Sequence, residues 1–190
     1  MMGKVIIATG IPGSGKTTVL GAAKERTSQK FSVVTFGTVM FDMAKKKKIV
    51  EHRDELRMLP QQKQRELQKL AGEKIAAMAK SETIVVDTHC TIKTPSGYLP
   101  GLPEWVLRAI KPDIILIVES DAAEIASRRG RDGSRVRDEE SEEEIELHQE
   151  INRANAIACS ILTGATVRII YNHDNHLDAA ARDMAKVIEE

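Results

Sequence analysis

The sequence predicts an α/β fold, in which a five-stranded parallel sheet is covered by helices on both faces. Two observations predict it. Five short apolar runs, most of them rich in β-branched residues, recur along the 190-residue chain, and stretches of helical periodicity separate them. Because parallel neighbours need crossover connections, alternating strands and helices are typical of such a sheet. The length indicates one domain over residues 1–190.

The composition excludes several classes of protein. A hydrophobic fraction of 42% supports a real core, and a formal net charge of zero offers no global field for nucleic acid or an anionic membrane. Aromatic residues make up 3%, too few for a protein that stacks bases on aromatic platforms. The two cysteines are far apart in sequence, so neither a zinc site nor a disulfide framework is expected. We find no secretory signal and no apolar stretch that spans a bilayer, and we expect a cytoplasmic protein.

The elements of the first part of the chain follow from its apolar pattern. In chain order they are a strand at 5–8, a glycine-rich loop, a helix at 16–30, a strand at 31–36, a helix at 38–48 and a helix at 61–80. Pro60 breaks the segment before the last of these helices, after which apolar residues return at helical spacing. The residues that share one face of this helix are Leu67, Leu70, Ala71, Ile75 and Met78.

The second part continues the alternation. In chain order it contains a strand at 82–89, a loop at 94–103, a helix at 105–110, a strand at 113–120, a helix at 121–129, a polar segment at 128–137, a long helix, a strand at 166–171 and a helix at 175–190. Three prolines and two glycines predict the loop. Gly164 is expected to end the long helix. That helix is expected to bury one stripe, made of Ile145, His148, Ile151, Ala154, Ala158 and Ile161.

The segment after the first strand has the spacing of a phosphate-binding loop. Gly10, four residues and then Gly15-Lys16-Thr17 form the Walker A pattern, placed between a strand and a helix. The glycines let backbone N–H groups converge on phosphate oxygens, and the start of the helix adds its positive end. Lys16 is expected to reach the β- and γ-phosphates, and the Thr17 hydroxyl to bind Mg²⁺. We therefore predict a P-loop NTPase fold, with the nucleotide held by Gly10, Ile11, Pro12, Gly13, Ser14, Gly15, Lys16, Thr17 and Thr18.

Asp87 follows the third predicted strand, at the edge of the sheet where α/β proteins place their ligands. We expect its carboxylate to hold a water on the Mg²⁺ ion, which is the Walker B role. The alternative role for this residue is a cap on the turn that follows the strand.

Five arginines occur within ten residues that also contain two glycines; they are Arg128, Arg129, Arg131, Arg135 and Arg137. The arginine side chain is a planar fork of donors that matches phosphate oxygens and stays charged. Beside a Walker A loop, this pattern predicts a glycine-hinged lid. The alternative is a solvated charge run that pairs with the acidic residues after it.

A second anion site is expected between residues 37 and 59. Gly37 and Thr38 close the second predicted strand, and Arg53 and Arg57 lie four residues apart, on one face of a helix. Two cations there suit a second anionic substrate. A surface helix with ordinary charges explains them equally well.

The chemistry of the candidate residues favours a phosphate as the acceptor. A hydroxyl acceptor usually needs a positioned base, whereas a phosphate oxygen is already ionised at neutral pH. The sequence offers many arginines and few isolated carboxylates near the predicted strand ends, which is typical of a site that brings two phosphorylated ligands together. A GTPase is not indicated, because the motifs N-K-x-D and D-x-x-G are both missing.

These motifs together resemble the archaeal-type adenylate kinases. The stretches that carry the resemblance are GIPGSGKTT, FGTVM, RDELRMLP, VVDTH, RRGRDGSRVRDEE and HQEINRANA. The resemblance implies reversible transfer between ATP and AMP with Mg²⁺, a segment that binds the nucleoside monophosphate at about 37–80, and a short lid at about 128–138. It also implies a homo-oligomer, with a trimer as one form. From the composition we expect no nucleic acid or membrane as partner.

The resemblance also implies roles for single residues. AMP would be held by Thr38, Arg53 and Arg57, and Arg153 would join the site. The catalytic residues, which act on the transferring phosphate, would be Lys16, Arg128, Arg129, Arg135 and Arg137. The chain departs from the D-G-F-P-R signature of other adenylate kinases, since Asp87 is followed by no arginine. His89 is the candidate substitute, and a hydrogen-bonded loop residue is the alternative.

Two other functions stay open at this point. One is a kinase for another monophosphate, such as UMP, CMP or a deoxynucleotide. The other is a nucleotide-switched assembly factor with weak kinase activity.

Overall fold

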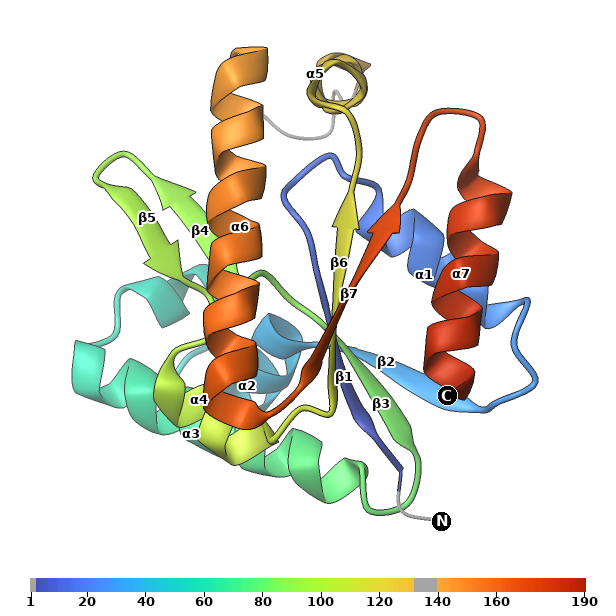
Figure 1. Ribbon diagram of the computed structural model, residues 1–190. Helices are drawn as coiled ribbons and strands as arrows, with labels where there is room; N and C mark the ends of the chain where they lie inside the picture. The colour runs from blue at the N-terminus through green and yellow to red at the C-terminus, as the bar shows by residue number, and fades with distance from the viewer. Residues whose placement is uncertain (1–2, 132–139) are drawn as a thin grey trace.

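A computed structural model, which describes residues 3–131 and 140–190 apart from the Arg57 side chain, confirms the predicted α/β class. Within those residues, parallel strands form one sheet in the order β2-β3-β1-β6-β7 (Figure 1). Their bounds are Val5–Thr9 for β1, Phe31–Thr35 for β2, Thr83–Asp87 for β3, Ile114–Glu119 for β6 and Thr166–Tyr171 for β7. Each of the five apolar runs of the sequence therefore forms a strand, with ends within three residues of the predicted ones.

Helices cover the sheet on both faces. They are α1 (Lys16–Lys24), α2 (Phe36–Lys46), the 3₁₀ helix η1 (Arg53–Arg57), α3 (Gln61–Met78), α4 (Glu104–Ile110), α5 (Ala122–Arg131), α6 (Glu142–Thr163) and α7 (Leu177–Glu189). Helices α1 and α7 pack on one face, and α2, α3, α4 and α6 on the other (Figure 1). No helix in the two described ranges has the length and apolar character that crossing a membrane requires.

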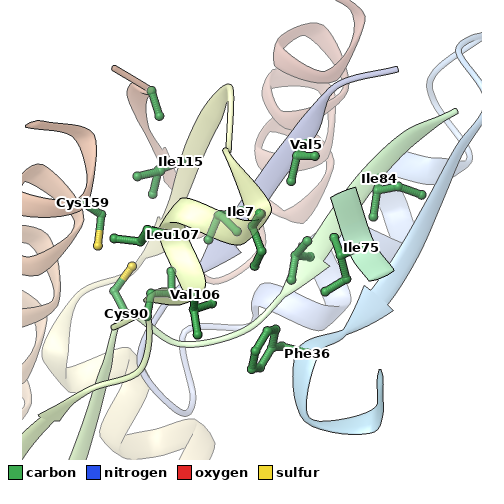
Figure 2. Packing of buried hydrophobic residues seen from close by; sticks show 14 of the residues in the cluster. Val5, Ile7, Phe36, Ile75, Ile84, Cys90, Val106, Leu107, Ile115 and Cys159 are labelled. Atoms are coloured by element: carbon green, nitrogen blue, oxygen red, sulfur yellow. The ribbon is translucent and has the colours of Figure 1, made fainter. Parts of the chain in front are cut away.

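The alternation of side chains along the strands explains why both faces are covered. Ile6 and Leu116 belong to the cluster under α1 and α7, whereas Ile7 and Ile115 belong to the cluster on the opposite face (Figure 2). All four side chains are fully buried, and each such burial stabilises the fold by roughly 1.5–3 kcal/mol. A strand that is apolar on both faces is typical of a parallel sheet.

The predicted loop at 94–103 is wrong in part. Strands β4 (Thr91–Thr94) and β5 (Gly97–Pro100) form an antiparallel hairpin that stands clear of the main sheet (Figure 1). The prolines permit it because Pro95 lies in the turn and Pro100 ends the second strand, where neither interrupts a central ladder.

The start of α2 also differs from the prediction. Gly37 and Thr38 do not close the second strand, because the helix begins at Phe36 and places both in its first turn. Phe36 is buried in the core against α3 and α4, which fixes the point where the strand turns into a helix.

The stripe predicted for α6 is wrong after its second member. The buried residues of this helix are Ile145, His148, Asn152, Ala156 and Cys159, whereas Ile161 is 80% exposed. The helix carries apolar residues on two faces, and the inner face includes the polar Asn152, so hydropathy alone selects the wrong one. The large apolar side chains left exposed on the outer face are Leu147, Ile157, Ile161 and Leu162.

Candidate functional site

The glycine-rich loop joins β1 to α1 and has a backbone shape that its glycines permit. Gly13 and Gly15 have φ angles of 91° and 81°, in the left-handed region that favours glycine. A Cβ at Gly15 would also lie 2.2 Å from Nδ2 of Asn172. That amide donates a hydrogen bond of 2.9 Å to the Ser14 carbonyl. The end of β7 therefore holds the loop in place.

Lys16 begins α1 and is 7% exposed. Its Nζ donates to the Thr88 carbonyl oxygen at 2.6 Å and forms an ion pair with the Asp87 carboxylate. Burial lowers the pKa of the Lys16 amine, and the Asp87 carboxylate opposes that shift. The structure thus brings together the lysine and the acid that the sequence selected separately.

Asp87 lies between the two expected anion sites. In the sheet it is paired with Ala8 of β1, which leads into the glycine-rich loop, and with Thr35 of β2, which leads into α2. Thr17, which carries the expected hydroxyl ligand, lies in the first turn of α1 and is exposed. A hydroxyl and a carboxylate are oxygen donors of the kind that Mg²⁺ prefers, so these residues fit that ion.

Arg128 and Arg129 lie in the last turn of α5, as the predicted helix at 121–129 places them, and the helix continues to Arg131 into the predicted polar segment. Arg128 donates to Asp174 at 2.8 and 2.6 Å and to the Asn172 carbonyl oxygen at 2.8 Å. Its remaining nitrogen, Nη1, is buried near Gly15 and has no hydrogen-bond partner among residues 3–131 and 140–190. Such a donor beside a phosphate-binding loop fits an anionic ligand.

The second arginine contacts the loop directly. Arg129 donates from Nε to the Pro12 carbonyl oxygen at 2.8 Å and pairs through Nη1 with Glu140 at 2.7 Å. The predicted hinge at Gly130 is helical despite the low helix propensity of glycine, and these bonds hold the turn beside it against the glycine-rich loop. Arg135 and Arg137 lie outside the described residues.

The start of α2 forms the other side of the site. The Arg53 guanidinium lies so close to Gly37 that a Cβ there would be 2.8 Å from Nη2. Thr38 is the next residue and is exposed. Arg57 is the last residue of the 3₁₀ helix η1, and its side chain lies outside the described residues.

His89 makes the kind of contact expected of a hydrogen-bonded loop residue, its alternative role, whereas the contact of Arg153 was not expected. His89 donates from Nδ1 to the Gly10 carbonyl oxygen at 2.9 Å, a bond that ties two loops together. Arg153 makes a two-pronged ion pair with Glu119, at 3.0 and 2.7 Å, and this contact raises the pKa of Arg153. Arg153 lines a cavity of about 360 Å³ between α6 and the ends of β6 and β7, whose lining includes no residue of the glycine-rich loop.

Several residues that hold the site were not predicted from the sequence. Asn172 bonds the glycine-rich loop, and Asp174 bonds Arg128. Their position just after the fifth strand, at the carboxyl edge of the sheet, could have indicated them. Glu124 supports the same loop by accepting the Asp174 N–H at 2.7 Å. Burial opposes its ionisation, yet hydrogen bonds from Ser120, Asp174 and His173, together with Arg128, lower the pKa of Glu124 to about 2.

Comparisons with known proteins agree with this geometry. A family model described as an AAA domain matches residues 9–146. The chain is 52% identical to the adenylate kinase of Methanocaldococcus jannaschii over the full length of both, and 52% identical to that of Methanopyrus kandleri over 98% of both. It is 49% identical to the adenylate kinase of Methanothermobacter thermautotrophicus, over 98% of this chain and all of that one.

Solved structures show the likeness of fold alone. Shikimate kinase from Acinetobacter baumannii, in complex with shikimate, superposes with a TM-score of 0.54 at 15% identity, over 98% of this chain and 91% of that one. Shikimate kinase from Bacteroides thetaiotaomicron gives 0.56 at 14% identity, over 98% and 99%.

Proposed function

Because this chain belongs to the archaeal-type adenylate kinase family, we propose that it transfers a phosphoryl group reversibly from ATP with Mg²⁺ to AMP, giving two ADP. One observation supports the two-nucleotide site best. Asp87 and its partner Lys16 lie between the glycine-rich loop and the α2 start that Arg53 approaches. Anion-binding features therefore face the same acid from both sides.

The donor nucleotide occupies the glycine-rich loop, Gly10 to Thr18, in this proposal. The N–H groups of the loop and the first turn of α1 cradle its phosphates. Lys16 leaves Asp87 and neutralises charge that develops between the β- and γ-phosphates. Arg128 contributes its unpartnered Nη1 from the other side of the loop.

The acceptor occupies the segment 37–80. Arg53 and the first turn of α2 hold the AMP phosphate, since a helix N-terminus and a guanidinium both favour an anion. Thr38 adds a hydroxyl, and Arg57 a second cation. Arg153 stays a candidate for this site as a sequence prediction, although its described side-chain partner is Glu119.

The Thr17 hydroxyl and the Asp87 carboxylate would hold Mg²⁺ in this proposal. The ion would supply charge neutralisation on the donor phosphates. Lys16 and Asp87 form an ion pair in the structure, and in this proposal Lys16 would turn to the donor phosphates while Asp87 would hold the ion.

The segment 128–138 closes over the phosphates as a lid. Its first residues belong to α5, and Arg129 among them donates a hydrogen bond to the glycine-rich loop. Arg135 and Arg137 would then reach the transferring phosphate. Cationic side chains of this kind act most strongly in the transition state.

We also propose that the enzyme is a cytoplasmic homo-oligomer. The outer face of α6 supports self-association, because Leu147, Ile157, Ile161 and Leu162 are large apolar side chains exposed on one helix. A trimer is the form that the resemblance to the family implies.

An acceptor panel tests the proposal. With ATP as donor, AMP should be phosphorylated at least ~10-fold more efficiently than UMP, CMP or the deoxynucleotides, since a pocket that reads a base discriminates by that margin or more. A preference for another monophosphate would assign a different acceptor. ATP hydrolysis that exceeds transfer to every monophosphate would contradict the kinase itself.

A competition experiment tests for two sites. A dinucleoside polyphosphate with an adenosine at each end should compete with ATP and with AMP. Competition with ATP alone would indicate a single nucleotide site, and the proposal would be wrong.

A further inference from the structure

The described residues contain a buried hydrogen-bonded junction that the reaction outlined above does not use. Thr9, the last residue of β1, is fully buried, and Asn152 on α6 is 2% exposed. The Thr9 hydroxyl accepts the N–H of Cys90 at 2.8 Å and donates to Oδ1 of Asn152 at 3.3 Å. One side chain thus joins the end of β1, the loop after β3 and the middle of α6.

This junction lies three residues from the acid assigned to the metal. Several bonds fasten the loop from Asp87 to Cys90 to the end of β1 and the glycine-rich loop. Three of them are Thr88 N–H to the Ala8 carbonyl at 3.1 Å, His89 Nδ1 to the Gly10 carbonyl at 2.9 Å, and Cys90 N–H to Thr9 Oγ1 at 2.8 Å. The last of these is the only one of the three whose acceptor is a side chain. It can therefore be removed by substitution without altering the backbone.

Lys16 depends on the same loop. Its amine donates to the Thr88 carbonyl and pairs with Asp87, so both of its partners move if the loop moves. A displacement of about 1 Å in a catalytic group costs up to about 100-fold in rate. The hydroxyl at position 9 is thus placed to set the distance between the lysine and the acid.

We propose that Thr9 and Asn152 are positioning residues, which hold the Asp87–Cys90 loop in register with the phosphate-binding loop and thereby set the Asp87 carboxylate for Mg²⁺. The inference rests on the proposed role of Asp87. It does not require either residue to touch a substrate. Asn152 orients the Thr9 hydroxyl by accepting a hydrogen bond from it. The lone pairs of that hydroxyl oxygen are then free to accept the Cys90 N–H.

The first experiment replaces Thr9 by valine, which keeps the branched shape and removes the hydroxyl. We expect Thr9→Val to lower kcat at least ~10-fold, to raise the Mg²⁺ concentration for half-maximal rate, and to change KM for ATP by less than ~3-fold. Thr9→Ser should restore kcat to within ~3-fold of the wild type, because it restores the hydroxyl. Asn152→Leu should lower kcat in the same direction by a smaller factor.

Thr83→Val is a matched control. Thr83 is also a buried strand threonine, 4% exposed, and its hydroxyl bonds Lys4 N–H and Gln29, at the opposite, amino end of the sheet. We expect this variant to lower the melting temperature and leave kcat and the Mg²⁺ dependence unchanged. Equal losses of kcat in Thr83→Val and Thr9→Val would reduce Thr9 to a structural residue and overturn the inference.

Combining Thr9→Val with Asp87→Asn tests whether Thr9 acts through the Asp87 carboxylate. If Thr9 acts through Asp87, Thr9→Val should cost at least ~3-fold less in kcat in the Asp87→Asn background than in the wild type. Full activity of Asp87→Asn alone would contradict the proposed metal role. An inactive Asp87→Asn together with an unaffected Thr9→Val would instead refute the positioning role and leave the proposed function intact.

Discussion

The ion pair between Lys16 and Asp87 supports the sharpest prediction, which is the effect of Lys16→Met. Methionine fills a similar volume and removes the charge. At an effective dielectric constant of about 20, a unit charge about 4 Å from another contributes about 4 kcal/mol. If that contribution is made to the transferring phosphate mainly in the transition state, its loss lowers kcat by about 10³-fold, at about 1.4 kcal/mol for each factor of ten.

The same substitution has a separate effect on stability. It leaves the Asp87 carboxylate, whose side chain is 17% exposed, without its cationic partner. Breaking a buried pair costs roughly 3–5 kcal/mol, and the cost here should fall below that range because water reaches the acid. The double variant Lys16→Met/Asp87→Asn should therefore recover stability relative to Lys16→Met and remain inactive.

A coupled assay of ADP formation measures the rate, and urea denaturation measures the free energy of unfolding. Lys24→Met, at the exposed end of α1, is the control and should leave both unchanged. A Lys16→Met enzyme with a rate within tenfold of the wild type would show that the lysine does not act on the phosphates. Recovery of activity in the double variant would show that its main role is to neutralise Asp87.

Other predictions concern the lid, acid stability and assembly. Arg137→Ala should lower kcat more than it lowers ATP affinity, and an unchanged maximal rate in steady-state kinetics would remove Arg137 from the catalytic set. The folded pKa of Glu124, about 2, lies below its ordinary value of 4.5, so its stabilisation is complete above about pH 4.5 and is lost as pH falls toward 2. In Glu124→Gln, the free energy of unfolding should fall less steeply below about pH 4.5 than in the wild type. The same pH dependence in both proteins would contradict the contribution of Glu124 to stability. Ile161→Asp, on the exposed face of α6, should shift the protein toward monomers in light scattering, and an unaltered mass would place the interface elsewhere.

The order of the elements and the phosphate-binding loop could be predicted because both depend on local sequence. An apolar run such as Ile114–Val118 has one stable environment, a strand buried on both faces. The glycine spacing from Gly10 to Gly15 permits a backbone shape that few other segments adopt. These features needed no knowledge of distant contacts.

The wrong predictions share a different cause. The buried face of α6 includes Asn152 because Thr9, 143 residues earlier in the chain, offers it a hydrogen bond. Helix α5 continues to Arg131, past its predicted end at residue 129, and Arg128 and Arg129 find partners there in Asp174 and Pro12. Hydropathy cannot show such partners, since a polar residue is stable in a core only where another segment satisfies it.

The sequence by itself determined that this chain folds as a parallel α/β sheet with a phosphate-binding loop at the end of its first strand. Only the tertiary structure decided that Lys16 of this loop pairs with Asp87, which bonds hold Arg128 and Arg129 beside the loop, and which side of α6 stays exposed. The physical reason is the separation along the chain over which each kind of interaction acts. Backbone conformation and hydropathy act over a few residues, whereas charge pairing and hydrogen bonding in the site join residues as far apart as Lys16 and Asp87 or Ser14 and Asn172.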